Sequence, residues 1–392
     1  MDLPNDALIN FIFPNNAHIV WSLMIVIYPF ITGLIAGAFV VSTLSHVMKI
    51  KDFEPLANFA LIAAFCFGLF AGVPLLVHLG QPQRAFNIYF TPHTTAAMSV
   101  FGYVYGGYMI LLAIEIWFVY REHFVRMANE TRGMVRLLWS GLCLGVTTYH
   151  PDSGKVDRKF IYWLALIGIP WAFLLHGYVG FIFGSVKAIP WWATALQPII
   201  FLSSAVVSGM AMILIMYIFM KWRNQTHYDY IMIKKFSAIM WGIFIIDWGL
   251  EMLELVHVWY RNDFDWTQIQ PLISGPIFTS YVLGQILVLS LIPTIILAVV
   301  VLSKITGKIM MYLAVLASVL HVLQVLFMRF NVVVGGQSIS KSGRGFVEFH
   351  WEVFGKEGML TAILILAAPF VVYYLISRVL PIFEEKARDM GN

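Results

Sequence analysis

The chain has 392 residues, of which 60% are hydrophobic and only 12% are charged. A soluble domain carries about 25% charged residues, so the composition argues against a soluble globular protein. The net charge of +4 is small, and there is no Lys/Arg patch of the kind that marks nucleic-acid binding. The two cysteines, Cys66 and Cys143, exclude a disulfide scaffold. They are also too few to hold a [4Fe–4S] cluster, which needs about four thiolates.

Nine long apolar segments follow one another along the chain, and about 20 apolar residues suffice for a helix to cross a bilayer. The sequence therefore predicts an all-α integral membrane protein, a polytopic bundle of nine transmembrane helices within a range of eight to ten. We expect two four-helix bundles plus one or more extra helices at the C-terminal end. The segments cover residues 17–48, 54–79, 95–121, 159–186, 191–223, 229–260, 272–303, 306–333 and 358–380.

The distribution of Lys and Arg predicts the orientation, because cytoplasmic loops are enriched in these residues. The loops after the odd-numbered spans and the C-terminal tail contain 18 of the 25 Lys and Arg residues. We therefore expect the N-terminus outside and the C-terminus inside. The acidic N-terminus lacks the positive charge that opens a signal peptide, so the first apolar segment is expected to stay as a helix.

A single domain with four regions is expected from this pattern. They are an outer N-terminal segment (1–16), the core helices (17–333), an outer loop (334–357), and a last helix with an inner tail (358–392).

The sixth apolar segment contains Asp247, Glu251, Glu254 and His257. Ionisable residues inside a membrane span are costly and are functional candidates. Spacings of four and three place the three carboxylates on one face of a helix. Apposed carboxylates in a low dielectric cannot all ionise, so we expect at least one to hold a proton, as in a proton relay. Structural pairing with Arg261 or another arginine is the alternative, and a metal site is less favoured because one histidine is a poor ligand set.

Two further spans carry ionisable or hydrogen-bonding groups at depth. His176 and Tyr178 lie among glycines that allow a flat ring to approach, and either side chain can hydrogen-bond a quinone carbonyl and transfer a proton to it. The alternative for His176 is a hydrogen bond to a neighbouring helix. Glu115 lies beyond the middle of the third span and could extend a proton path inward.

Most of these polar groups fall in the outer half of their spans under the predicted orientation. This clustering predicts a site near the outer face, reached laterally from the lipid and contacting a water-soluble partner outside. Besides the sixth span, the residues concerned are His18, His78, Arg84, Tyr178 and Arg329. The candidate quinone-binding residues are Asn16, His18, His78, Arg84, His176 and Tyr178.

Two stretches resemble the NrfD/PsrC family, the membrane subunits of polysulfide-reductase-type complexes. The first is His78-Leu-Gly-Gln-Pro-Gln-Arg84, followed by Ser99 and Gly102. The second runs from Tyr178-Val-Gly through Pro190-Trp-Trp, Pro198 and Ser203-Ser-Ala to Gly209, and Ile31–Ala38 matches a glycine-rich helix of the family. Residues 329–337 are similar to the longer members, which include the DsrP-like and HmeB-like subunits.

The resemblance implies a membrane subunit that binds menaquinone or menaquinol and holds neither haem nor an iron–sulfur cluster. It implies electron exchange with a ferredoxin-like iron–sulfur subunit on the outer face, within a prokaryotic membrane complex that also has haem-containing and catalytic subunits. Tyr178 matches the family's quinone-binding tyrosine. Asp247, Glu251, Glu254 and Glu115 are of the type proposed for proton paths in the family. His78 replaces its usual acidic residue.

Two other functions compete with this one. A dihaem cytochrome b-type anchor would need axial histidine pairs, and His176, His257 and His321 could offer one pair. No span, however, carries two histidines at the spacing that brackets two stacked haems. An ion or proton transporter would use the same carboxylates, but transporters commonly place interrupted helices near the midplane, whereas these groups lie toward one face.

Overall fold

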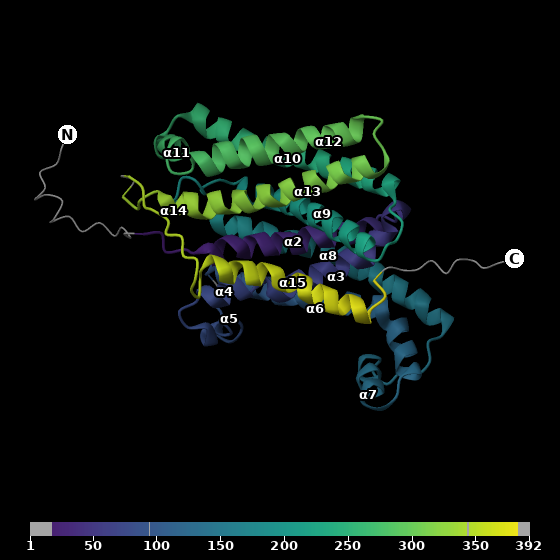
Figure 1. Ribbon diagram of the computed structural model, residues 1–392. Helices are drawn as coiled ribbons and strands as arrows, with labels where there is room; N and C mark the ends of the chain where they lie inside the picture. Colours follow the sequence, from purple (N-terminus) through teal and green to yellow (C-terminus); the bar gives the residue numbers. More distant parts are fainter. Residues whose placement is uncertain (1–17, 94, 343–344, 383–392) are drawn as a thin grey trace, which may run out of the picture.

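The computed structural model describes residues 18–93, 95–342 and 345–382. Long helices run side by side along one axis, and short helices cap their ends (Figure 1). We call the end where α2 begins the outer end, following the predicted orientation, and the opposite end the inner end. The outer N-terminal segment expected over residues 1–16, which includes the candidate Asn16, lies outside the described residues.

The long helices form two groups of four. The first bundle packs α2 (Leu23–His46), α3 (Glu54–Ala71), α6 (Ala97–Glu130) and α8 (Pro151–Gly184). The second packs α9 (Gln197–Arg223), α10 (Tyr230–Arg261), the rod formed by η3 (Phe278–Leu291) and α12 (Ile292–Leu302), and α13 (Gly307–Phe330). The C-terminal helix α15 (Met359–Val379) belongs to neither group and lies against α3 and α2. The predicted pair of bundles with an extra C-terminal helix is therefore confirmed.

Short elements complete the described part of the chain. They are η1 (Lys51–Phe53), α4 (Val73–His78), η2 (Pro82–Arg84), α5 (Asn87–Phe90), α7 (Gly133–Leu142), α11 (Phe264–Ser274), η4 (Asn331–Gly335) and α14 (Gly336–Ser338). Several boundaries differ from expectation. α6 ends at Glu130, nine residues after the predicted end at 121. α8 begins at Pro151, eight residues before the predicted start at 159, and the helix that follows residue 306 continues through η4 and α14 to Ser338.

Eight segments of the described chain are long and apolar enough to cross a membrane. The remaining long helix, α10, has 32 residues but carries three carboxylates and is not among these eight. It nevertheless lies side by side with the neighbouring helices of the second bundle (Figure 1). The nine predicted segments therefore correspond to nine helical rods in the described part of the chain, and α10, the one not among these eight, carries most of the candidate proton-path residues.

The two bundles meet where α2 and α9 cross at glycines. A Cβ atom added to Gly37 would collide with the backbone of Ala205 and Gly209, and one added to Gly209 would collide with Gly37. Small residues allow such close backbone approach, which is a main source of helix association in membranes. The joint between the bundles thus depends on two positions that tolerate no side chain.

We predict that Gly37→Ala lowers the thermal stability of the purified protein, because a methyl group at this crossing must push α2 away from α9, an overpacking that costs roughly 1–3 kcal/mol. Gly249→Ala is the matched control, since no atom lies within 4 Å of a Cβ at that position. The two buried cysteines provide the measurement, because a thiol-reactive dye labels them only as the fold opens. Equal melting temperatures for the two variants would contradict the prediction.

Candidate functional site

The carboxylates of α10 face the second bundle. Asp229 caps the start of this helix by accepting a hydrogen bond from the Met232 amide, 2.9 Å away. At about 100° per residue, Asp247, Glu251 and Glu254 share a face, and the side chains change from buried to half-buried toward the outer end. His257 is rotated by a further ~60° and is exposed. The helix therefore presents three carboxylates to the bundle and the histidine away from it.

The outer end of α10 turns sharply into α11. Asn262 adopts a left-handed conformation (φ 47°), and Asp263 caps α11 by accepting from the Asp265 amide. Arg261 Nε donates to Asp263 at 2.7 Å, and this guanidinium holds the pKa of Asp263 below its usual value. This turn brings Ile269 of α11 into the lining of the pocket beside α10.

A directed chain of hydrogen bonds ends on Glu251. Ser280 Oγ donates to Asn331 Oδ1 (2.6 Å), Asn331 Nδ2 donates to Gln285 Oε1 (2.9 Å), and Gln285 Nε2 donates to Glu251 Oε2 (3.0 Å). The orientation of both amides is assigned from these bonds. Ser280 and Gln285 lie in the π-helical segment η3, and Asn331 opens the π-helical turn η4. π-Helical turns are frequent at functional sites, and here they bring three polar side chains together in otherwise apolar spans.

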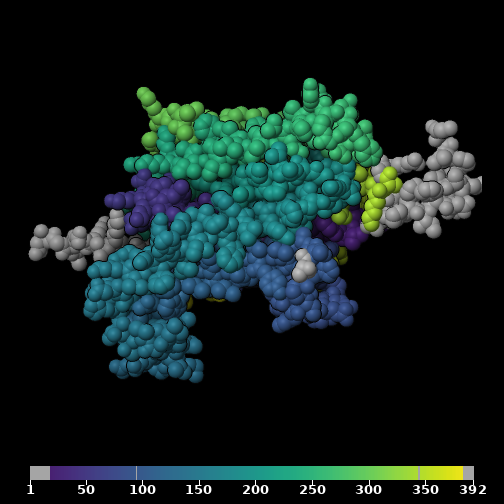
Figure 2. Space-filling model, turned by 180° about the vertical axis from the view of Figure 1, so that it is seen from behind, coloured from purple at the N-terminus to yellow at the C-terminus, as the bar shows by residue number. Residues whose placement is uncertain are grey.

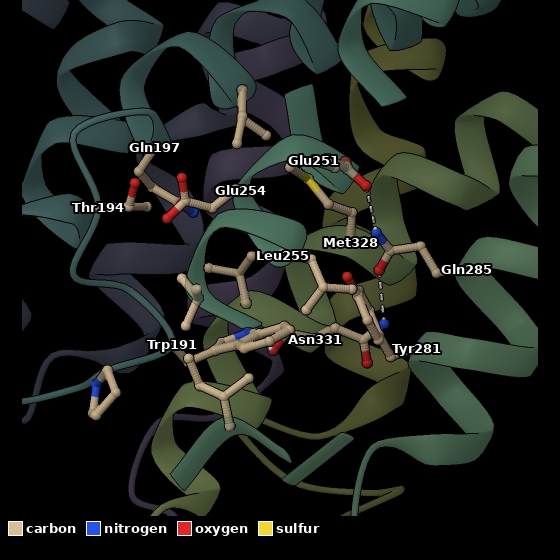
Figure 3. Close-up of a pocket in the computed structure, with 15 residues that line it drawn as sticks. Trp191, Thr194, Gln197, Glu251, Glu254, Leu255, Tyr281, Gln285, Met328 and Asn331 are labelled. Carbon is tan, nitrogen blue, oxygen red and sulfur yellow. Dashed lines mark hydrogen bonds between the residues drawn. The ribbon is translucent and has the colours of Figure 1, made fainter. Parts of the chain in front are cut away.

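A pocket lies beside these hydrogen-bonded residues in the outer half of the second bundle (Figure 3). Its empty space, including the open mouth, is about 640 Å³. Two carboxylates, three amides, and the rings of a tryptophan and a tyrosine lie among apolar side chains. The lining is Pro190, Trp191, Thr194, Gln197, Ile200, Glu251, Glu254, Leu255, Val258, Ile269, Tyr281, Gln285, Met328, Asn331 and Val332. We refer to it as the α10 pocket.

Behind the pocket, Arg329 is fully buried and connects both bundles. Its Nη2 donates to Ser204 Oγ (2.7 Å), to the Phe201 carbonyl (3.1 Å) and to His176 Nε2 (3.1 Å), and its guanidinium lies 3.8 Å from the Phe201 ring centroid. Since arginine can only donate, His176 Nε2 must accept, so a neutral imidazole carries its proton on Nδ1. That atom lies 3.3 Å from Thr32 Oγ1 on α2 and donates to it. One cation thus joins α13, α9, α8 and α2.

Arg329 also interacts electrostatically with Asp247 and Glu251. Among the described residues it makes no direct ion pair with a carboxylate. Asp247 instead accepts from Ser203 Oγ at 2.6 Å. Several buried atoms in this region have no hydrogen-bond partner within the described chain, namely Asp247 Oδ2, Glu251 Oε1, Arg329 Nε, both ring nitrogens of His321 and both amide atoms of Gln324. Buried polar groups of this kind are normally satisfied by internal water, so the α10–α13 interface has the chemistry of a hydrated region.

The predicted quinone-binding residues are not brought together by the fold. Tyr178 donates to the Ala97 carbonyl at 2.9 Å, and His176 belongs to the Arg329 contacts. His78 pairs with Glu357 at 2.7 Å, and Arg84 is exposed in η2. His18 lies on the outer surface with its ring 4.1 Å from that of His350. Among the described residues of this set, none lines the α10 pocket.

The predicted proton-path residues separate into four places. Glu251 and Glu254 line the α10 pocket, Asp247 lies one turn deeper, and His257 faces outward. Glu115 is buried in the first bundle, where its Oε1 lies 3.3 Å from Nδ1 of His46 near the inner end of α2. His46 lines a polar cavity at the inner end of that bundle, together with Lys49, Glu54, Asn58, Glu122, Asp157 and Arg158.

Sequence reasoning missed most of the other pocket residues. Gln285 and Asn331 are amides inside or beside apolar spans, a signal that could have been used, and Trp191 belongs to the Pro-Trp-Trp motif. Tyr281 carries no signal of its own in the sequence. Its position in the pocket depends on how η3 begins after the bend at Gly275.

These features define a polytopic helical membrane protein with a buried site of carboxylates, amides and aromatic rings between its helices. Residues 13–340 match the protein family described as "Polysulphide reductase, NrfD". The chain therefore belongs to the NrfD family, as its sequence motifs implied.

Relatives with assigned names are similar over about half of the chain. A selenate reductase subunit of Mesobacillus selenatarsenatis is 38% identical over 207 residues, which are 51% of this chain and 48% of the relative. Protein NrfD of Escherichia coli is 24% identical over 50% of the chain and 59% of its own length. The Hdr-like menaquinol oxidoreductase integral membrane subunit of Archaeoglobus fulgidus is 22% identical over 58% and 49%. The chain spans about half the length of these relatives.

We predict that Arg329→Met destabilises the protein strongly. The substitution leaves His176, Ser204 and two buried carboxylates without the shared cation, and breaking a buried charged contact costs roughly 3–5 kcal/mol. Arg84→Gln, at an exposed position of η2, should leave the melting temperature unchanged. Thermal unfolding in detergent measures both variants, and an Arg329→Met protein as stable as Arg84→Gln would show that the contacts of Arg329 do not hold the bundles together.

Proposed function

We propose that this chain is the quinone-reacting membrane subunit of a respiratory redox complex, and that the quinone head group binds in the α10 pocket. The observation that carries this proposal is the position of buried Glu251 and half-buried Glu254 in a pocket between membrane helices, next to aromatic rings and amides. Trp191 and Tyr281 offer flat faces to a quinone ring, and Gln197 and the carboxyl groups offer hydrogen bonds to its oxygens.

Quinone reduction takes up two electrons and two protons, and quinol oxidation releases them. In this proposal Glu251 and Glu254 exchange protons with the quinone oxygens, since carboxyl groups within hydrogen-bond reach act as general acids and bases. Arg329 interacts with both Asp247 and Glu251. The positive charge of Arg329 is neutralised when Asp247 and Glu251 together hold one proton. Uptake or release of a proton by these two carboxyl groups then takes the cluster only one charge away from neutrality.

Further proton transfer follows the polar residues away from the pocket. Asp247 lies one turn deeper in α10, and the ring nitrogens of His321 on α13 have no hydrogen-bond partner within the described chain. In the first bundle, Glu115 and His46 adjoin the polar cavity at the inner end. We propose these groups as proton-path members, and His257 as a surface group at the outer end.

Electrons come from a partner in this proposal, because the chain's two cysteines are buried and far apart in sequence. A ferredoxin-like iron–sulfur subunit is proposed at the outer end, where Trp351 and Phe354 of the loop after α14 are exposed. The names of the relatives support a subunit role, since they describe subunits of a selenate reductase and of a menaquinol oxidoreductase. Menaquinone, a DsrP-like role in sulfur metabolism, further haem-containing and catalytic subunits, and a place in the prokaryotic cell membrane with the N-terminus outside are proposed on the same basis.

We predict that Glu251→Gln lowers quinol-dependent electron transfer by the purified complex by about 10²-fold or more, the usual contribution of a general acid–base group. The loss should appear in the maximal rate more than in the apparent quinone affinity, because the amide keeps the size of the carboxyl. The measurement is quinol oxidation by the intact complex with a soluble electron acceptor.

Paired tyrosine variants locate the quinone. If the head group lies in the α10 pocket, Tyr281→Leu, which removes the flat ring from the pocket wall, should weaken quinone binding more than Tyr178→Phe, whose hydroxyl is already bonded to the Ala97 carbonyl. A larger effect of Tyr178→Phe would move the quinone to the first bundle. Haem b held by this chain after subunit separation would favour a cytochrome b-type anchor, and a complex without quinone or iron–sulfur partner would favour a transporter.

A further inference from the structure

Two short segments project sideways from the same face of the first bundle, one near each end of α6. Residues 82–90, from η2 to α5, lie beside the start of α6, and residues 132–146, which include α7, lie beside its end. We call them the outer flange and the inner flange. Figure 2 shows both projections on one side of the molecule, with a hollow between them.

The outer flange is fixed to α6 at the level of Gly102. Tyr89 Oη donates to the Gly102 carbonyl at 3.1 Å, and Tyr103 Oη donates to the Tyr89 carbonyl at 2.8 Å. Two of its aromatic side chains face away from the protein, since Phe86 is 61% and Phe90 is 80% exposed. Arg84 is exposed at the same flange.

The inner flange is fixed to α6 near His123. The Trp139 ring of α7 lies 5.8 Å from the rings of His123 and Phe124, and Trp117 Nε1 donates to the Leu142 carbonyl at 2.7 Å. No residue of α7 is buried. Met134, Leu137 and Leu138, three and four positions apart on one face, are 80%, 72% and 67% exposed.

The separation of the two attachments equals the thickness of a bilayer core. From Gly102 to His123 there are 21 helical steps, or about 32 Å at 1.5 Å per residue, against a hydrocarbon thickness of about 30 Å. A second helix gives the same thickness. His123 Nε2 donates to the carbonyl of Val379, the last residue of α15, so α15 ends at the level of the inner flange. The 21 residues of α15 span about 32 Å at 1.5 Å per residue. Each flange therefore lies at the depth of one membrane surface.

The surface between the flanges is apolar, as a lipid-facing surface must be. Exposed side chains there include Ile110 and Ile114 on α6 and Phe160 and Ile167 on α8. Arg84 on the outer flange, and Arg132 and Arg136 on the inner one, make no ion pair within the described part of the chain. Exposed apolar residues beside arginines are the pattern of segments that lie in the membrane interface.

We infer that the two flanges are interfacial anchors that hold a strip of phospholipid bilayer between them, with Phe90 and Leu138 in the acyl-chain boundary and the arginines at lipid phosphates. This face of the first bundle then belongs to lipid, so the partner subunits of the complex bind elsewhere. The inference is independent of the proposed quinone function, because it depends only on the depth and exposure of the flanges.

Spin labels test this placement in the full complex, reconstituted in vesicles of phosphatidylethanolamine and phosphatidylglycerol. Single labels are placed by Phe90→Cys and Leu138→Cys in a chain carrying Cys66→Ala and Cys143→Ala. Collision rates with molecular oxygen, which enters lipid, and with a polar nickel chelate, which stays in water, give the depth of each label. The controls are Leu364→Cys on the exposed face of α15 and Lys155→Cys at the exposed start of α8.

We expect the oxygen-to-nickel collision ratio of both flange labels to exceed that of Lys155→Cys several-fold and to fall below that of Leu364→Cys. A ratio equal to that of Lys155→Cys at either flange would place that flange in water and overturn the inference. Immobilised labels that neither reagent reaches would show a protein partner on this face, which also overturns it. Loss of quinone activity in any of these variants would not alter either outcome, because depth is measured directly.

Discussion

A single buried cation, Arg329, is the constraint on which the arrangement of this molecule depends. An uncompensated charge inside a bilayer is costly, so the surrounding helices must supply acceptors from several directions. A hydroxyl, a backbone carbonyl, an imidazole and an aromatic face from α8 and α9 do so directly. Because His176 in turn donates to Thr32 of α2, the position of Arg329 in one bundle determines contacts inside the other.

The same cation accounts for the presence of two carboxylates at that depth. Burying Asp247 and Glu251 in an apolar bundle would cost much more for their ionised forms without positive charge nearby. Arg329 supplies it at a distance rather than in a direct ion pair, so each carboxylate keeps one oxygen for other partners. A direct ion pair between Arg329 and Glu251 would have occupied the carboxylate oxygens of Glu251. Because the two groups interact at a distance instead, Glu251 remains in the wall of the α10 pocket.

The helices themselves were predictable, because hydropathy over 20 or more residues is set by the membrane and not by tertiary detail. The face of α10 was predictable for a similar reason, since helical spacing alone brings Asp247 and Glu251 to one side. The pocket was not. Tyr281, Gln285 and Asn331 meet because η3 and η4 depart from regular α-helical spacing, and no local pattern in the sequence announces those departures. Tyr178 is the opposite case. The sequence motif singled it out as a candidate, but in the fold its hydroxyl is bonded to the Ala97 carbonyl and it does not line the α10 pocket.

The length of the membrane-spanning part, measured along α6 and α15, also limits where an electron-transfer partner could bind. Glu251 lies ten residues before Arg261 at the outer end of α10, or about 15 Å along the helix axis. A water-soluble partner cannot enter the hydrocarbon, and a quinone head group does not leave the membrane. A site that serves both must therefore lie close beneath a membrane surface, and the α10 pocket meets this requirement at the outer end. The turn at Asn262 brings Ile269 of α11 into the lining of the α10 pocket, so the proposed partner at this end of the molecule would dock close to the carboxyl groups that we propose exchange protons.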